Sequence, residues 1–266
     1  MNRLFPIVMS MFFAPVIHAE SDLLATQAGQ TFGVSLSSYQ YNEPSVMSLQ
    51  GRKLALDLQV NRLLENQQFF RGELRYAGGT VDYTSNGTGS RTGIPDLYLE
   101  ARGMVGKDWL MNNAVLVSYF GVGYRYLYND ARGVNCTNTA CYWGYRRESN
   151  YLYLPVGVSY RMAAPNNARW VGTLEYDHLV TGRQISRLSD GGQGDGDISN
   201  LQTQGYGLKM SMLFENRNWS IGPFVHYWNI AQSEKVIAFK NGVADSWAWE
   251  PSNNTLEFGV QVAQPF

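Results

Sequence analysis

The stretch NTLEFGVQVAQPF, residues 254–266, decides the fold of this chain. Leu256, Phe258, Val260 and Val262 share one parity, which Phe266 continues, while polar or small residues hold most of the other positions. Because successive side chains of a β-strand point to opposite faces, this alternation predicts a strand with one apolar face.

The same period of two residues recurs along most of the chain and predicts further strands. Ten such runs are found, at residues 31–41, 50–62, 68–83, 96–107, 114–129, 150–162, 169–180, 203–215, 219–230 and 253–266. They are about twice the usual globular length of 5–6 residues, and a tilted membrane-spanning strand needs about 9–11. The ninth run is the least certain, because Pro223 interrupts it and its two faces are similar. Eight strands is the alternative if the ninth or the first run is not a strand.

The connections between these runs alternate in length. LLENQQ, DWLMNN, AAPNNA and NRN are short, whereas the longer, polar segments are 42–49, 84–95, 130–149, 181–202 and 231–252. Transmembrane barrels have short periplasmic turns, longer extracellular loops and an outward apolar face. The sequence therefore predicts an all-β chain that forms a single antiparallel transmembrane β-barrel of about ten strands.

Aromatic residues gather near both ends of the predicted strands. Trp109, Trp170 and Trp219 flank three of the short turns. The ends that lead to long loops carry Tyr83, Tyr126, Tyr128, Tyr151, Tyr227 and Trp228. Two aromatic girdles are expected where a barrel crosses the two membrane interfaces.

The first residues have the layout of a secretory signal peptide. A short basic segment, MNR, precedes the apolar run LFPIVMSMFFAPVI, and Ala19 offers a small residue for cleavage. The run is shorter than the roughly 18–20 apolar residues of a membrane-spanning helix. We expect residues 1–19 to be the signal peptide and residues 20–266 to be the barrel domain.

The C-terminal strand resembles that of bacterial outer-membrane β-barrel proteins, in which a final aromatic residue forms part of the signal read by the assembly machinery. Phe258, Val260, Val262 and Phe266 match this pattern, and Gln264 departs from it. The resemblance implies the outer membrane of a Gram-negative bacterium as location. It also implies membrane lipid, lipopolysaccharide and the assembly machinery as partners, and the net charge of −1 gives no general attraction to nucleic acid.

If the apolar parity faces lipid, the other parity brings charges into the lumen. Seven are positive and six are negative: Lys53, Arg71, Arg75, Arg102, Arg125, Arg161, Lys209, Asp57, Glu73, Glu100, Glu175, Asp177 and Glu257. A ten-stranded barrel is narrow, and unpaired buried charge is costly, so we expect these groups to pair and fill the lumen. A narrow porin for small solutes is the alternative.

Ten strands are also found in the omptins, which are outer-membrane proteases. Asp177 and His178 invite the comparison, but adjacent strand residues face opposite sides, and Asp82 has no second carboxylate on its face. Neither His178 nor His226 lies in a recognisable motif. We therefore expect no catalytic residues, cofactor or metal, and an enzyme at the barrel rim ranks behind the porin alternative.

Two long loops carry the candidates for surface contact. Cys136 and Cys141 are close enough in sequence for a local disulfide, as expected in an exported protein. Aromatic and arginine side chains are favoured at binding hot spots. The candidates are Trp143, Tyr145, Arg146, Arg147, Trp247 and Trp249. Anchoring of the rim to the membrane is the alternative role for Tyr145, Arg146 and Arg147. The glycine-rich loop 189–200 is expected to be solvated, with a calcium site as its alternative.

Overall fold

The computed structural model describes residues 24–137 and 140–266, so the predicted signal peptide, 1–19, lies outside the described residues. Ten long strands form the barrel, which confirms the predicted number. They are β1 (Gly29–Glu43), β2 (Met47–Leu63), β3 (Gln68–Ser85), β4 (Gly89–Leu110), β5 (Ala114–Cys136), β6 (Cys141–Ala164), β7 (Ala168–Arg187), β9 (Gly205–Glu215), β10 (Ser220–Ile230) and β13 (Asn253–Pro265).

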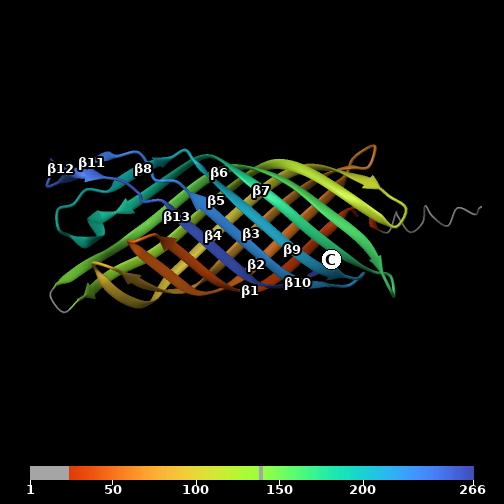
Figure 1. Ribbon diagram of the computed structural model, residues 1–266, viewed down its shortest axis with the longest axis horizontal. Coiled ribbons are helices and arrows are strands. Elements are labelled where there is room, and N and C mark those ends of the chain that lie inside the picture. Colours follow the sequence, from red (N-terminus) through yellow and green to blue (C-terminus); the bar gives the residue numbers. More distant parts are fainter. Residues whose placement is uncertain (1–23, 138–139) are drawn as a thin grey trace, which may run out of the picture.

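The strands are antiparallel neighbours and close into a ring, in the order β1, β2, β3, β4, β5, β6, β7, β9, β10 and β13 (Figure 1). The C-terminal strand pairs with the first, and Val262 lies opposite Val34. Closure leaves no free strand edge in lipid, where an unpaired backbone group would be costly. Pro223 lies within β10 opposite Val260, so it does not interrupt the strand.

Smaller elements lie beyond one end of the barrel (Figure 1). They are the 3-10 helix η1 (Leu188–Gly191), β8 (Ile198–Gln202), which pairs with the end of β7, and the hairpin of β11 (Val236–Lys240) and β12 (Val243–Ala248). In the part of the chain that the structure describes, no helix is long and apolar enough to cross a membrane.

The strands run further at this extracellular end than the sequence pattern predicts. Most of the segment 130–149, predicted as a loop, continues β5 and β6, which are 23 and 24 residues long. Segments 42–49 and 84–95 likewise belong mostly to strands. Strand outside the membrane keeps its backbone ladder but needs no lipid-facing apolar residues, so the alternation that marks a strand is lost there.

The two faces of the barrel wall differ as a membrane requires. Leu36 is 60% exposed on the outer face, whereas its neighbour Ser37 is 4% exposed on the inner face. The same outward exposure is found for Leu54, Phe120, Val156 and Phe258. Large apolar side chains outside and polar side chains inside reverse the arrangement of a soluble barrel.

The aromatic girdle at the short-turn end contains exposed Trp109, Trp170 and Trp219, as predicted. The prediction for the other end was wrong for Tyr151 and Trp228, which are 5% and 3% exposed and lie in the lumen. Both have the inward parity of their strands. Two other inward tyrosines fill space over glycines of neighbouring strands: a Cβ atom on Gly123 would lie 2.2 Å from Cζ of Tyr153.

Candidate functional site: the charged lumen and its inner cavity

The structure places all thirteen predicted lumen charges on the inner face of the barrel. Ten of them are buried, and Asp57, Glu73 and Arg102 are half-buried. The parity of each strand positions these side chains, since the opposite parity carries the lipid-facing residues. Most of them belong to charged networks that join different strands across the lumen, and Arg147, Glu43 and Glu250 form a further layer at one end.

The middle layer joins opposite walls of the barrel. The Lys209 ammonium on β9 donates to Glu100 on β4 at 2.5 Å and lies 3.4 Å from both Glu175 and Asp177. Strands β5, β6 and β7 separate β4 from β9, so the Lys209–Glu100 pair crosses the lumen. The guanidinium of Arg102 contacts both Glu73 and Glu175 and extends this layer.

A second network surrounds Arg75. Its guanidinium donates to Asp57 at 2.8 Å, to Glu257 at 3.1 Å and to the hydroxyl of Ser35 at 3.1 Å. The Arg75 Nε donates to the Tyr98 hydroxyl at 2.7 Å, and that hydroxyl donates to Glu257 at 2.7 Å. The buried carboxylate of Glu257 therefore has two donors besides the hydroxyl of Ser37.

Lys53 and Arg125 lie closer to the extracellular end. Lys53 contacts the carboxylate of Asp96 and lies 4.2 Å from the centre of the Tyr39 ring. The Arg125 guanidinium lies 4.2 Å from the centre of the Tyr98 ring. Asp96, which is buried, is missing from the thirteen predicted charges. It shares the parity of Tyr98, so a consistent parity rule would have found it.

The further layer, called the extracellular layer below, closes the extracellular end. Arg147 on β6 contacts Glu43 on β1 and Glu250, which precedes β13. Four strands separate β1 from β6 in either direction, so the Arg147–Glu43 pair also crosses the lumen. Arg147 therefore points inward, although it was predicted as a surface-contact residue. Burial raises the pKa of Glu250, and the charge of Arg147 opposes that shift.

The other predicted contact residues divide into two groups. Arg146 donates its backbone N–H and its Nε and Nη2 groups to Asp190 of η1, at 2.8–3.0 Å, and these hydrogen bonds lower the pKa of Asp190. Tyr145 is half-buried. Exposed tryptophans form the second group: Trp143, Trp247 and Trp249 are 54%, 63% and 43% exposed.

A disulfide and several ion pairs hold the extracellular segments in place. The predicted disulfide between Cys136 and Cys141 is confirmed and closes the tip of the β5–β6 hairpin. Asp195 pairs with Lys240 of β11 at 3.5 Å, and Asp197 pairs with Arg187 of β7 at 3.1 Å. All three aspartates of loop 189–200 thus have basic partners, which leaves the calcium alternative without a free carboxylate there.

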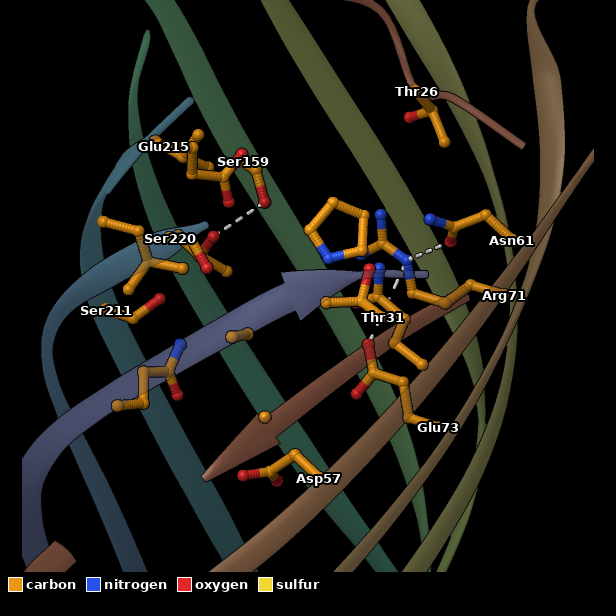
Figure 2. Close-up of a pocket in the computed structure, with 18 of the residues that line it drawn as sticks. Thr26, Thr31, Asp57, Asn61, Arg71, Glu73, Ser159, Ser211, Glu215 and Ser220 are labelled. Atoms are coloured by element: carbon orange, nitrogen blue, oxygen red, sulfur yellow. Dashed lines mark hydrogen bonds and ion pairs between the residues drawn. The ribbon is translucent and has the colours of Figure 1, made fainter. Parts of the chain in front are cut away.

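The periplasmic half of the lumen contains a cavity of about 630 Å³, which is called the inner cavity below. Lys209 and Glu175 line its closed end, and Asn167 and Asn216 of the short turns line its other end. The cavity is therefore bounded by the charged middle layer and reaches the periplasmic side. Figure 2 shows polar side chains on its facing walls, with Asn61, Arg71 and Glu73 on one side and Ser159, Ser211 and Ser220 on the other.

Two features of the cavity were not found from the sequence. Leu24, Thr26, Gln27 and Ala28 line it, and Arg161 donates to the carbonyl of Leu24 and to the hydroxyl of Thr26, both at 3.1 Å. His226 also lines it, with its ring 4.8 Å from that of Phe224. The inward parity of β10 would have placed His226, but Pro223 and the similar faces of this strand obscured it.

Asp177 and His178, the pair that resembles an omptin site, lie on opposite faces. Asp177 is fully buried, and neither of its oxygens accepts a hydrogen bond from a described residue. His178 is exposed, and its ring is stacked with that of Tyr176, with 6.4 Å between the two ring centres. The two side chains cannot act on one substrate in this arrangement.

No family model matches the sequence, and no curated protein matches it. The structure is similar to the outer membrane protease OmpT from Escherichia coli, with 11% identity and a TM-score of 0.60 over 92% of this chain and 100% of that one. It also matches the β domain of the Bordetella autotransporter BrkA, with 14% identity and a TM-score of 0.43 over 90% and 100% of the two chains. A major outer membrane protein from Thermus thermophilus matches with 14% identity and a TM-score of 0.38 over 89% and 99%.

At these identities the likeness shows the fold alone. A closed antiparallel ring of ten strands, an outward apolar belt and a polar interior define a bacterial outer-membrane β-barrel protein. Its strands cross the bacterial outer membrane, with short turns at one side and strand extensions at the other.

Proposed function

We propose that this protein is a non-enzymatic outer-membrane barrel that displays its extracellular segments for contact with a ligand or a surface, while paired charges keep its lumen closed. The observation that carries the proposal is the pair of cross-lumen contacts, Lys209–Glu100 and Arg147–Glu43. Each joins strands that are separated by at least three others around the ring, so side chains cross the lumen at two levels.

Passage of an ion would require these contacts to open. Breaking a buried pair leaves an uncompensated charge at a cost of about 3–5 kcal/mol. Glu100 contacts Lys209 and Arg125 together, and Glu175 contacts Arg102 and Lys209 together. Moving one side chain therefore disturbs several partners, which favours a closed lumen over a conduit.

The proposed contact surface consists of exposed tryptophans on extracellular segments that a disulfide and ion pairs hold in place. Trp143 belongs to β6, near the disulfide, and Trp247 belongs to β12. Preorganised aromatic side chains lose little conformational entropy on binding. Arg146 and Arg147 have partners within the protein, so we assign the contact to Trp143, Trp247 and Trp249. Lipid and lipopolysaccharide are proposed to surround the belt, and the assembly machinery to bind β13.

The test is adhesion of cells that express the protein to arrays of glycans, extracellular-matrix proteins and abiotic surfaces. The double variant Trp143→Ser/Trp247→Ser is compared with the control Trp109→Phe/Trp170→Phe, which changes two tryptophans at the periplasmic end. The proposal predicts that cells with the wild type or the control adhere to at least one of these surfaces. Cells with Trp143→Ser/Trp247→Ser should no longer adhere to it. Equal adhesion of cells with the wild type, the control and the double variant would contradict a contact role for Trp143 and Trp247.

A narrow porin is the competing function, and the inner cavity is the feature that favours it. The cavity provides half of a path through the membrane. A porin would in addition need an opening through the middle and extracellular layers, which conductance measures directly.

A further inference from the structure

The inner cavity contains an arginine, Arg71, whose guanidinium is held in place but has only a long ion pair, 3.9 Å from its Nε to the Glu73 carboxylate. Arg71 is 9% exposed, and its Nε donates to the side-chain oxygen of Asn61 at 3.0 Å. Its guanidinium carbon lies 5.0 Å from the centre of the Phe69 ring and 5.8 Å from that of Tyr119. The amide and the two rings fix the plane and direction of the group.

The terminal nitrogens of Arg71 donate no hydrogen bond to any described residue, and Arg71 lines the cavity (Figure 2). Its nearest carboxylate is Glu73, at 3.9 Å, and Glu73 contacts Arg102 more closely. A guanidinium presents two parallel N–H groups that match a carboxylate in a bidentate manner. The free edge of Arg71 therefore offers this geometry to a molecule in the cavity.

The surrounding charge favours an anion. Arg161 also lines the cavity and is close enough to Arg71 to interact with it electrostatically, whereas Arg169, another lining residue, is paired with Glu215 at 2.8 Å. Asp57, the other acidic side chain near this wall, is bound to Arg75 at 2.8 Å. Glu73 and Asp57 thus have closer partners, and the ion pair of Arg71 with Glu73, at 3.9 Å, is longer than a hydrogen bond.

The cavity walls also suit an apolar body. Leu24, Tyr119, Val171 and Phe224 line it together with the polar residues. Its volume of about 630 Å³ lies within the range of about 300–1,000 Å³ that is usual for small-molecule sites. A ligand that combines an apolar body with one anionic group would use both kinds of wall.

We propose that the inner cavity binds small organic carboxylates from the periplasmic side, with Arg71 as the carboxylate-binding residue. The ligand's carboxylate accepts two hydrogen bonds from the terminal nitrogens of Arg71, and its apolar part contacts Tyr119 and Phe224. The site goes beyond the proposed display function and does not depend on it, because the cavity lies on the periplasmic side of the charged middle layer.

The test is isothermal titration of the refolded barrel in detergent micelles with benzoate. Benzamide, a neutral analogue of the same shape, and inorganic phosphate serve as comparison ligands. Three proteins are titrated: the wild type, Arg71→Gln, and the control Arg62→Gln, which changes an exposed arginine of β2 that does not line the cavity. Heat-modifiable migration in gels establishes that each variant has folded.

We expect the wild type and Arg62→Gln to bind benzoate equally, and Arg71→Gln to bind it about tenfold or more weakly, as expected for loss of a charge-assisted pair of hydrogen bonds. Benzamide and phosphate should bind the wild type more weakly than benzoate. Absence of benzoate binding, equal binding by Arg71→Gln, or equal binding of benzamide would overturn the site. Tighter binding of phosphate would overturn its assignment to carboxylates. If Arg71→Gln does not fold, the comparison of ligands on the wild type still decides whether the protein prefers a carboxylate to its neutral analogue.

Discussion

The two halves of the lumen use the same kinds of charged residue but are filled differently. In the extracellular half, Arg125, Tyr151, Tyr153 and Trp228 are long or aromatic side chains, and they close the space between opposite walls. In the periplasmic half many of the residues that line the cavity are small, among them Gly33, Ser159, Ser211, Ser220 and Ala263. The number of strands sets the width of the barrel, and the size of the inward side chains decides which half is closed.

The comparison predicts that charge removal is most destabilising in the closed half. In Glu100→Gln, Lys209 and Arg125 both lose a buried counter-charge, and we expect a loss of about 3–5 kcal/mol in the free energy of unfolding. The matched variant Glu215→Gln breaks the pair with Arg169 near the periplasmic turns, where both side chains are at least 20% exposed. There we expect about 0–1 kcal/mol. Urea titrations of the refolded barrels measure both values, and equal losses would contradict the distinction between the halves.

Packing is the next largest expected effect. Gly123→Ala would push the methyl group into the ring of Tyr153, from which a Cβ atom would be only 2.2 Å away. We expect a cost of about 1–3 kcal/mol, as for other overpacked cores. Gly172→Ala is the control, because no heavy atom lies within 4 Å of its added Cβ atom. The same urea titration would contradict close packing in the lumen if the two alanine variants were equally stable.

The extracellular layer should hold the segment 231–252 against the barrel. In Arg147→Gln, Glu43 and Glu250 lose their shared partner. We expect protease cleavage within 231–252 to become about tenfold faster, which corresponds to about 1.4 kcal/mol in the local opening equilibrium. The control Arg132→Gln removes a pair in which the arginine is 53% exposed, and it should leave cleavage unchanged. An unchanged rate in both variants would show that Arg147 does not hold the segment.

The sequence predicted the membrane-spanning part of this barrel well, because lipid imposes an apolar residue at every second position. This constraint ends at the membrane boundary, so the inward direction of Arg147 was missed once β6 was assumed to begin at residue 150. The cavity in the periplasmic half of the lumen was also missed. Parity shows which side chains point inward, but whether they fill the space depends on three-dimensional packing across strands distant in sequence, as Arg71 and Ser159 illustrate.

The smallest predicted effect is the response of η1 to pH. Hydrogen bonds from Arg146 lower the pKa of Asp190 below its ordinary value of 3.8. The resulting stabilisation is complete at pH values above 3.8 and is lost as pH falls through the lowered pKa. Hydrogen exchange of residues 188–191, corrected for intrinsic rates, should accelerate in this acid range. In Asp190→Asn the acceleration should be smaller but not absent, because Asp197 accepts the backbone N–H of Ser189 and also has a lowered pKa. An identical response of the two proteins would exclude Asp190 as a source.

Closure of the lumen by the middle and extracellular layers is the central claim, and conductance of the refolded barrel in planar bilayers tests it most directly. After heat-modifiable migration has confirmed folding, we predict no steady openings for the wild type, because Lys209–Glu100 and Arg147–Glu43 cross the lumen. Steady single-channel openings of the folded wild type would contradict the account and would make a narrow porin the better description of this protein.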